Sequence, residues 1–443
     1  MAGSESGGKP TPKFELLIDG AAASPAVVES VIAIRVRLSQ DLASCLELRL
    51  SNSDLSWTEA DTFDEGKRVE VKLGYEETGI EQVFGGEIVR RDCEFPVRGP
   101  AVVTVVAFDK QAKLRRERRS RTWLDAKDSD IISALASDAG LSADVKATTT
   151  TLPYVVQFNQ PNLSFLYERC RRLGYIVTID EKDAKLTAKP IEDVTADVTL
   201  KWGKDLLAFS ARMSVASQLT EVSVRGWDMT KKEKIQDKLA ASAVKAQFGG
   251  SDLGAKLAES TGGKRTSLMA STPIFSLGEA TAMAESLMTA AAQTYALAEG
   301  TCQGDPKLRP GKALTVEEVG ARASGPYLVN EVYHHFQPGL GYSTHFQLNR
   351  PTERIPAGDP EPLPESVPAR EEGESEAPSF IEFDIRSVSG EDVAGWGYTV
   401  TLPNGETRKG KVDASGRIRL EGIRDPGEAK IELEVPEDLD HLG

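Results

Sequence analysis

The sequence predicts a mainly β protein with two similar β-barrels, a small α+β domain inserted between them, and a small β-domain at the C-terminal end. Three observations lead to this fold class. Short runs rich in β-branched and aromatic residues recur between Gly/Pro clusters, which is typical of strands separated by turns. One such pattern occurs twice in the chain, and a Pro/Glu-rich stretch sets residues 379–443 apart from the rest.

The clearest β pattern lies between Gln303 and Arg350. It predicts three strands, at Ala313–Val316, Tyr327–Phe336 and Tyr342–Leu348, separated by Ser-Gly-Pro and Gln-Pro-Gly turns. Apolar residues alternate along the strands on one face and gather at one end of the other face. This pattern suits the wall of a barrel that also makes contacts on its outside.

An earlier stretch has a similar pattern. Gly66-Lys67-Arg68-Val69-Glu70-Val71 matches Gly311-Lys312-Ala313-Leu314-Thr315-Val316, and Gly85–Arg90 resembles Ser324–Val329. In both places a turn with Pro and Gly and a strand ending in a polar-basic pair follow. Because the matches come in the same order, they predict a duplicated β-domain. The alternative is coincidence, since Gly-Lys hairpin starts are common in β proteins.

Length and composition limit the possible classes. A chain of 443 residues predicts about three domains, and its net charge of −15 argues against nucleic-acid binding. No apolar run approaches about 18 residues, so no membrane span is expected, and the first residues have no secretory signal. The four widely spaced cysteines indicate isolated thiols in a reducing compartment.

These patterns divide the chain into six segments. We expect a flexible N-terminus, a first barrel, an α+β insert, a second barrel, a Pro/Glu-rich linker and a C-terminal module: 1–13, 14–113, 114–197, 198–350, 351–378 and 379–443. Within the second barrel, residues 228–272 predict a weakly structured surface loop. The linker has seven prolines and eight acidic against two basic residues, a composition that stays extended.

Strands are expected in the first barrel at 14–18, 31–38, 46–50, 69–73, 83–90 and 102–108. In the insert, Asp128 and Asn162 are expected to cap helices at 129–139 and 163–173, and the second helix is expected to end at Gly174. A hairpin at 175–189 follows. In the second barrel we expect strands at 209–213 and 221–227.

A capping box at Ser276 and Glu279 predicts a long Ala-rich helix that reaches Glu299 and ends at Gly300. The C-terminal module has two expected hairpin turns, at Pro403-Asn404-Gly405 and at Asp413–Gly416.

A basic run, Leu114–Arg121, stands out in this acidic chain. Its candidate interface residues are Arg115, Arg116, Arg118 and Arg119. They predict either an ion-pairing surface that faces an acidic neighbouring subunit or an ordinary solvated helix or strand end.

No pattern in the sequence predicts catalysis. The chain lacks the usual nucleophile, phosphate-binding and metalloprotease motifs, and no pair of carboxylates stands out. His335 and His345 could face each other across a hairpin, but no Cys, Asp or Glu at ligand spacing completes a metal site. We therefore expect no enzyme activity, no cofactor and no metal, and a structural role.

Several stretches together resemble the late-control protein D family of contractile phages and the N-terminal hub part of VgrG spike proteins. The stretches are FNQPNLSFLYERCRRLGY, VRGWD, the Ala-rich helix, GDPKLRPGK, SGPYLVNEVYHHF and GYSTHFQLNR. The resemblance covers roughly residues 14–350. It implies a homotrimeric baseplate hub with two barrels in each chain that adapts a six-fold tail tube to a three-fold spike. The resemblance carries over no catalytic residue.

The chain departs from VgrG after Arg350, where VgrG continues into an OB-fold and a β-helix spike. The spike is therefore expected to be a separate protein, and the C-terminal module resembles transthyretin-like β-sandwiches. Expected partners are the tail tube protein, the spike, other baseplate proteins and an effector cargo. The hub would assemble in the cytoplasm and join a virion or tail-like particle, either released or membrane-anchored. The alternative is a tail-associated cell-wall hydrolase or glycan-binding protein.

Overall fold

The computed structural model describes residues 10–180, 182–191, 194, 196–229, 231–243, 254–351, 380–384, 393–402, 405–413, 417–421 and 430–434. The chain forms two compact units, residues 1–358 and 359–443. Residues 352–378 of the expected linker and residues 1–9 of the expected flexible N-terminus lie outside the described residues. The first strand begins at Pro12, inside the segment that was expected to be flexible.

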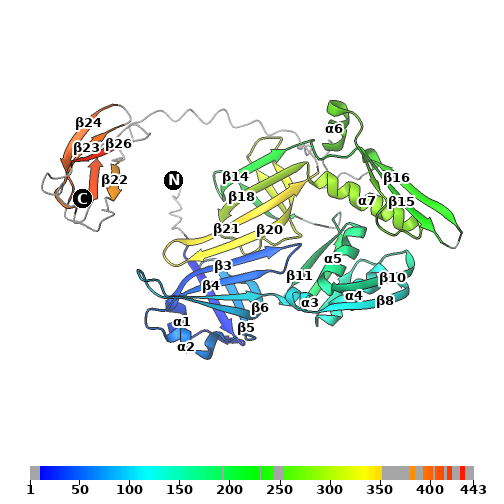
Figure 1. Ribbon diagram of the computed structural model, residues 1–443, viewed down its shortest axis with the longest axis horizontal. Coiled ribbons are helices and arrows are strands. Elements are labelled where there is room, and N and C mark those ends of the chain that lie inside the picture. Colours follow the sequence, from blue (N-terminus) through cyan, green and yellow to red (C-terminus); the bar gives the residue numbers. More distant parts are fainter. Residues whose placement is uncertain are drawn as a thin grey trace, which may run out of the picture. The chain divides into compact units, whose positions relative to one another are not determined.

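The larger unit is built on a thirteen-stranded sheet, counted over the described residues. The molecule is mainly β, as the sequence predicts (Figure 1). The strands before the insert are β1 (Pro12–Ile18), β2 (Ala21–Ala22), β3 (Val31–Ser39), β4 (Cys45–Ser51), β5 (Arg68–Tyr75), β6 (Gly79–Glu94) and β7 (Val102–Phe108). The strands after it are β13 (Ala196–Lys201), β14 (Leu206–Met213), β18 (Ala296–Gln303), β19 (Ala313–Glu317), β20 (Gly325–Gln337) and β21 (Gly341–Arg350).

These strands form two halves with the same order. The first half runs β3-β4-β7-β6-β5-β1, and the second runs β14-β18-β21-β20-β19-β13. If the six strands of each half are numbered in chain order, both halves have the same order across the sheet, 2-3-6-5-4-1. One pairing differs, because β1 is antiparallel to β5 whereas β13 is parallel to β19.

The repeated Gly-Lys motif has the same backbone geometry in both halves. Gly66 and Gly311 both have positive φ, +95° and +77°, which glycine adopts readily. In each half one residue, in β6 or in β20, makes two backbone hydrogen bonds with this motif. Its carbonyl accepts from the glycine N–H, and its N–H donates to the carbonyl of the lysine. These contacts are Gly66 N to Ile88 O (2.8 Å), Ile88 N to Lys67 O (2.9 Å), Gly311 N to Val329 O (2.9 Å) and Val329 N to Lys312 O (2.9 Å).

The halves also share two irregularities in strand register. The pairing shifts between Val31 and Ala33 in β3 and between Leu206 and Ala208 in β14. It shifts again between Ile88 and Arg90 in β6 and between Val329 and Glu331 in β20. A bulge marks one position in a strand, so these shifts align the halves residue by residue.

This alignment corrects one sequence match. The structural partner of Ile88 is Val329, because both follow the same bonds and precede the same shift. The sequence match of Gly85–Arg90 with Ser324–Val329 pairs Ile88 with Tyr327 and is therefore two residues out. The Gly66–Gly311 match has no such offset.

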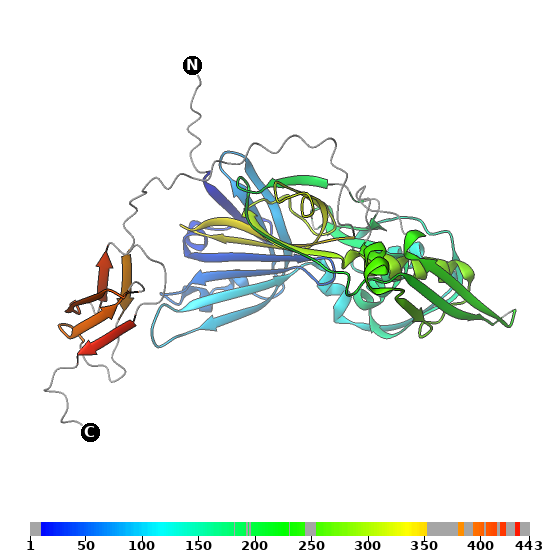
Figure 2. The ribbon, with the colours of Figure 1, turned by 90° about the horizontal axis from the view of Figure 1, so that it is seen from above.

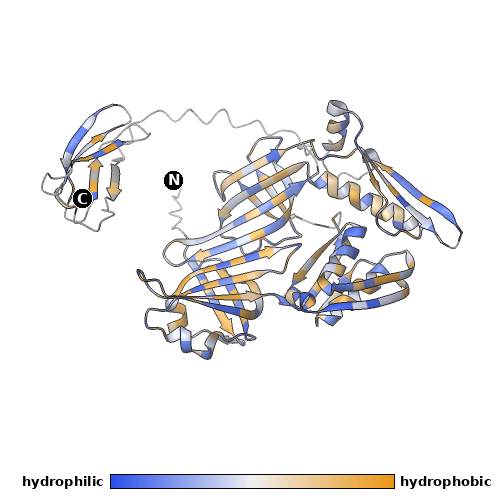
Figure 3. Cartoon of the chain, viewed as in Figure 1, coloured by the Kyte–Doolittle hydropathy of each residue, from blue (hydrophilic) through white to orange (hydrophobic). Residues whose placement is uncertain are grey.

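The two halves are joined within the chain. The second part of β20, Glu331–Phe336, pairs antiparallel with Ile34–Ser39 of β3, so both halves belong to one sheet and one hydrophobic core. The sequence predicts two barrels but does not predict this joint. Figures 1 and 2 show β3 and β20 side by side. Along these strands hydrophobic and hydrophilic residues alternate, which gives the sheet a buried and an exposed face (Figure 3).

Short helices complete the first half, namely α1 (Pro25–Ser30), α2 (Ser56–Glu59) and η1 (Asp61–Phe63). The α+β insert follows, with a core of its own. Its elements are η2 (Lys110–Ala112), α3 (Lys113–Arg116), β8 (Arg118–Lys127), α4 (Asp128–Asp138), β9 (Ser142–Val145), β10 (Thr151–Pro161), α5 (Asn162–Leu173), β11 (Tyr175–Asp180) and β12 (Lys185–Pro190).

The two helix caps expected in the insert are wrong. The N-cap residues are Lys127 and Pro161, without side-chain capping bonds, and Asp128 and Asn162 are the first helical residues. Their side chains are drawn instead into tertiary contacts with Arg169 and Arg121. The expected C-terminal glycine is present, since Gly174 caps α5 with φ +67°.

The expected loop at 228–272 is in fact largely structured. It contains β16 (Glu233–Ala240), η4 (Ala241–Ala243), α6 (Gly254–Gly262) and β17 (Thr266–Met269), and β15 (Glu221–Asp228) lies between β16 and β17. The period-2 pattern of β16 is weak because Glu233 and Asp237 lie on the same face of the strand as Ile235 and Leu239. The helix α7 (Leu277–Gln293) packs on this small sheet and on α5.

The expected helix end at Gly300 is wrong. Helix α7 begins at its Ser276 cap as predicted but ends at Gln293, and β18 starts at Ala296. Residues 296–303 have strand partners on both sides, β14 and β21, and this pairing overrides their helical propensity.

The smaller unit consists of two sheets around one cluster of apolar side chains. One sheet pairs β22 (Phe380–Asp384) with β25 (Arg417–Glu421), and the other has the order β24-β23-β26. The latter strands are β23 (Gly397–Thr401), β24 (Thr407–Lys411) and β26 (Lys430–Glu434). Strands β23 and β24 pair antiparallel on either side of the turn predicted at 403–405. Residues 403 and 404 of that turn, and residues 414–416 of the other predicted turn, are outside the described part.

Candidate functional site

The basic run predicted from the sequence spans the end of α3 and the start of β8. Arg115 and Arg116 are exposed on α3. Arg116 forms an ion pair with Glu87 of β6 at 3.0 Å, and Lys113 contacts the same carboxylate. Within the described part of the chain, Arg115 has no hydrogen bond or ion pair, so it is the member of the run with an uncommitted charge.

Arg118 and Arg119 are exposed on β8. Arg118 donates to the carbonyl of Asn159 at 2.7 Å, and Arg119 pairs with Glu117 at 2.9 Å. The bond to Glu117 raises the pKa of Arg119. The structure thus places all four candidate arginines on one exposed stretch, but three of them already have partners within the chain.

An apolar stripe on the ribbon β8/β10 was missed by the sequence analysis. Leu124, Tyr154, Val156 and Phe158 are all exposed, Leu124 to 69% and Phe158 to 78%. Tyr154 lies opposite Leu124, and positions 154, 156 and 158 alternate along β10. Their period of two in the sequence was the available signal.

Two strand segments of the large sheet are open, and they are the structural equivalents of the two strands that form the β3–β20 joint. Strand β14 pairs with β18 along its length and has no second full neighbour among the described residues, only one bridge from Trp202 to Leu206. Its side chains are largely exposed, Leu207 to 65%. The last part of β6 extends beyond its pairing with β5, which ends at Glu87, and has β7 on one side. Such open edges are ready to pair with another strand.

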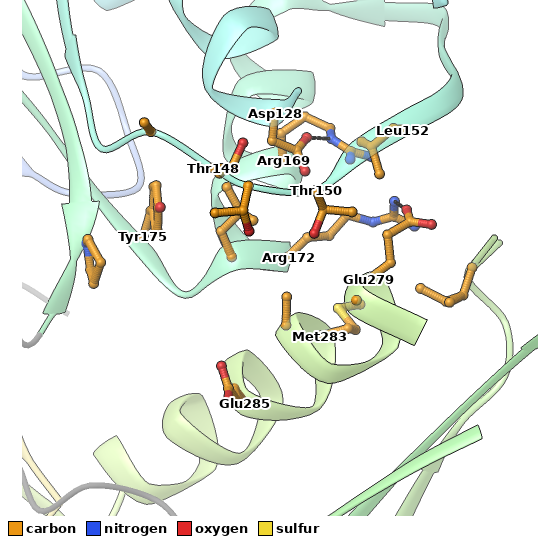
Figure 4. Close-up of a pocket in the computed structure, with 17 residues that line it drawn as sticks. Asp128, Thr148, Thr150, Leu152, Arg169, Arg172, Tyr175, Glu279, Met283 and Glu285 are labelled. Atoms are coloured by element: carbon orange, nitrogen blue, oxygen red, sulfur yellow. Dashed lines mark hydrogen bonds and ion pairs between the residues drawn. The ribbon is translucent and has the colours of Figure 1, made fainter. Parts of the chain in front are cut away.

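A cavity of about 280 Å³ lies between the insert and α7 (Figure 4). Four of its charged groups form ion pairs, because Arg169 binds Asp128 at 2.5 Å and Arg172 lies 3.8 Å from Glu279, and Glu285 also lines the cavity. Burial lowers the pKa of Arg172, and the nearby Arg169 lowers it further. The ion pairs link α4, α5 and α7.

The residues that line the cavity offer no matched nucleophile and base. Thr148 bonds Ser129 at 3.2 Å, and Glu279 also accepts from the Phe275 backbone at the start of α7. The lining includes neither His nor Cys. This arrangement can hold the insert against α7, which is a structural use of the charges.

The histidines of the hairpin β20/β21 have polar and aromatic neighbours. His345 bonds Thr301 at 3.2 Å, and its ring is tilted by 48° to that of Tyr333 at a centroid distance of 5.9 Å, while His335 lies opposite Ser343. His334 contacts Tyr342 at 2.8 Å, and burial holds its pKa well below the usual range. No group of three or more His, Cys, Asp or Glu residues within the described ranges could hold a metal ion.

The described helices include none that is long and apolar enough to cross a membrane. Burial raises the pKa of the thiols of Cys170 and Cys302, so they are poor nucleophiles. Cys93 is exposed near the end of β6.

The fold is similar to that of phage tail proteins. The 43 kDa tail protein of prophage MuSo2 from Shewanella oneidensis aligns with a TM-score of 0.59 at 13% identity, over 77% of this chain and 99% of that chain. A tail protein from Neisseria meningitidis aligns with a TM-score of 0.55 at 11% identity, over 78% and 98%. An E. coli component of the type VI secretion system aligns with a TM-score of 0.50 at 14% identity, over 79% and 81%.

Residues 11–338 match the family described as Alg8 N-terminal domain, and the chain belongs to this family. No curated protein matches the chain. At such low identities the structural similarities show a shared fold, and the function has to be argued from this chain.

Proposed function

We propose that the chain is the structural baseplate hub of a contractile phage tail or phage-like injection system. It would act as a homotrimeric adaptor between a six-fold tail tube and a three-fold spike formed by another chain. The observation that carries this proposal is the pair of matched six-strand halves in one chain. Three copies would present six near-equivalent halves to the tube and keep three-fold symmetry for the spike.

Two further observations support this function. The fold is shared with phage tail proteins and a type VI secretion component. The sequence also resembles late-control protein D and the VgrG hub in several ordered motifs. The two six-strand halves, which share one continuous core, support the two barrels expected from the sequence.

The paired charges favour a scaffold over a cell-wall hydrolase. In the described residues the cavity between the insert and α7 has both of its arginines and two of its three carboxylates in ion pairs between elements. A hydrolase would need a carboxylate pair or a nucleophile with its base facing open space. The smaller unit, with its two sheets, is a candidate transthyretin-like module that would contact the spike, an effector or the particle exterior.

Mass measurement and particle assembly test the proposal. Native mass spectrometry of the purified chain is expected to give a trimer, and co-expression with the tube and spike proteins of the same gene cluster should give a joint complex. A stable dimer or tetramer, or a trimer that binds neither protein, would overturn the adaptor. Zymography on cell walls provides the contrast, because a cleared band would favour the hydrolase.

A further inference from the structure

We propose that strand β14 of one copy pairs antiparallel with residues 90–94 at the end of β6 of a second copy, and that the adjoining Phe95 continues this contact. This contact would repeat between chains the joint that β3 and β20 make within a chain. The inference rests on the proposed trimer and specifies which surfaces hold it together.

The internal joint provides the template. Glu331–Phe336 of β20 pairs with β3 so that Val332, His334 and Phe336 face the core, opposite Leu38, Val36 and Ile34. On the outer face Tyr333 lies opposite Arg37, whose guanidinium sits 5.7 Å from the ring centroid, and Arg37 also forms an ion pair with Glu331. The joint thus combines an apolar inner face with a charged outer face.

The strands of the proposed contact are the structural equivalents of those in the template. The shift between Val31 and Ala33 in β3 recurs between Leu206 and Ala208 in β14. The shift between Val329 and Glu331 in β20 recurs between Ile88 and Arg90 in β6. In the template, β3 and β20 pair with each other across the joint. Within the described residues, β14 and the end of β6 have no strand partner on the corresponding edge.

Carrying the template register onto these strands gives defined residue pairs. Asp92 is placed opposite Arg212, Cys93 opposite Ala211 and Phe95 opposite Phe209. Directly opposite residues in antiparallel strands have Cα atoms about 4.5–5.5 Å apart.

The chemistry of the two strands fits this register. Arg212 is exposed and makes no ion pair among the described residues. Asp92 and Glu94 on the other strand are half-exposed and exposed acids on the matching face, where Asp92 pairs with Arg90 at 2.9 Å and Glu94 lies 4.0 Å from Arg49 in their own chain. On the inner face Phe95 is 58% exposed and would cover Phe209, which is only partly buried. An opposite-charge pair and an aromatic pair across strands each stabilise a sheet.

A second copy is the occupant that the geometry favours. Each chain carries one open edge of each kind, and the two are complementary to each other rather than to themselves. The contact is therefore head-to-tail. Such a contact closes into a ring when the rotation between neighbouring copies divides a full turn by the number of copies. Closure would also leave no exposed edge at β14, where a free strand would invite aggregation.

One substitution tests the register, because Cys93 is a native partner. In Ala211→Cys, the new thiol should form an intermolecular disulfide with Cys93 under mild oxidation, since the expected Cα separation lies within the about 4.4–6.8 Å that a disulfide spans. Non-reducing gels should convert most of the chain to covalent dimers and trimers, at least tenfold above wild type. Ser210→Cys is the matched control, because its side chain lies on the opposite face of β14.

The outcomes separate this inference from the proposed function. Native mass spectrometry of each variant is run first. If the protein is a trimer but Ala211→Cys crosslinks no better than Ser210→Cys, the strand pairing is overturned and the trimer is retained. Crosslinking of Ala211→Cys that persists when Cys93→Ser is added has the same meaning. Absence of any trimer overturns the proposed function itself. Crosslinking that is specific to Ala211→Cys and lost with Cys93→Ser supports the pairing.

Discussion

The two halves of the large sheet have one strand plan but different surroundings. In the first half, β3 and β4 are joined by residues 40–44, and β3 is covered by β20. In the second half, residues 214–295 leave the sheet between β14 and β18 and form a separate small sheet with α7. The equivalent of β3, strand β14, stays open. Thus a duplicated frame provides both an internal joint and a surface available for assembly.

The cores of the halves also differ in a compensating way. Leu48 and Val105 face each other across β4 and β7 in the first half. At the equivalent place in the second half, Gly300 faces Phe346 across β18 and β21. The second half thus has one large residue and one glycine where the first half has two side chains of medium size. Such an exchange keeps the interior filled.

The largest expected effect comes from removing the large member of this pair. Phe346 is fully buried, so Phe346→Ala should lower the free energy of unfolding by about 3–5 kcal/mol, measured by chemical denaturation. The matched control is Val105→Ala in the first half, which removes fewer atoms and should cost clearly less. Equal losses at the two sites would contradict the proposed exchange of volume.

Transplanting the first-half pair sharpens the comparison. A Cβ atom on Gly300 would lie 2.7 Å from ring atoms of Phe346 and 2.9 Å from the backbone oxygen of Ala208, so Gly300→Leu should overpack the core and cost about 1–3 kcal/mol. Adding Phe346→Val should recover the part of that loss that comes from the Phe346 ring, because the pair then has the size of Leu48 and Val105. Additive losses in the double variant would show that the sites are not equivalent.

The repeated glycines should respond to alanine in the same direction but by different amounts. Gly66→Ala meets no neighbour within 4 Å and should cost about 1–2 kcal/mol through its positive φ alone. Gly311→Ala has the same backbone penalty, and its new methyl group would also collide with Thr178 of the insert. The thermal midpoint of Gly311→Ala should therefore be the lower. The reverse order would contradict the contact with the insert.

Much of this frame follows from local sequence. The strands of 303–350 and the Gly66–Gly311 repeat were predictable because turn glycines and β-branched runs act over a few residues. The start of α7 was predictable from its capping box, whereas its end depended on distant partners of β18. The β3–β20 joint and the Gly300–Phe346 exchange could not be predicted, since nothing local records which strand lies opposite.

A smaller effect is expected for the proposed contact between copies. Arg212→Asp should weaken trimer formation, because it places a second acid opposite Asp92 and removes an attraction worth about 0–1 kcal/mol at an exposed site. The charge swap Asp92→Arg with Arg212→Asp should restore it. Sedimentation at several protein concentrations measures both variants. If the charge swap weakens trimer formation further than Arg212→Asp alone, Arg212 and Asp92 do not face each other.

The smallest effects are expected in the basic run, where the open question is between an interface and a solvated face. Arg116 and Arg119 pair with Glu87 and Glu117 in the chain, so changing either one disturbs exposed ion pairs worth about 0–1 kcal/mol. Arg115 is the cleaner probe, because it has no such partner among the described residues. Arg115→Ala should leave the unfolding midpoint unchanged.

Reversing Arg115, Arg116 and Arg119 to Glu together should then weaken assembly more strongly at low salt than at high salt, because exposed charges are screened within about 10 Å at 0.1 M. If the triple variant assembles like the wild type at every salt concentration, the run belongs to a solvated face. If Arg115→Ala alone loosens the trimer while folding stays intact, the basic run faces a neighbouring subunit. Assembly would then use a charged contact from the insert in addition to the strand edges of the two halves.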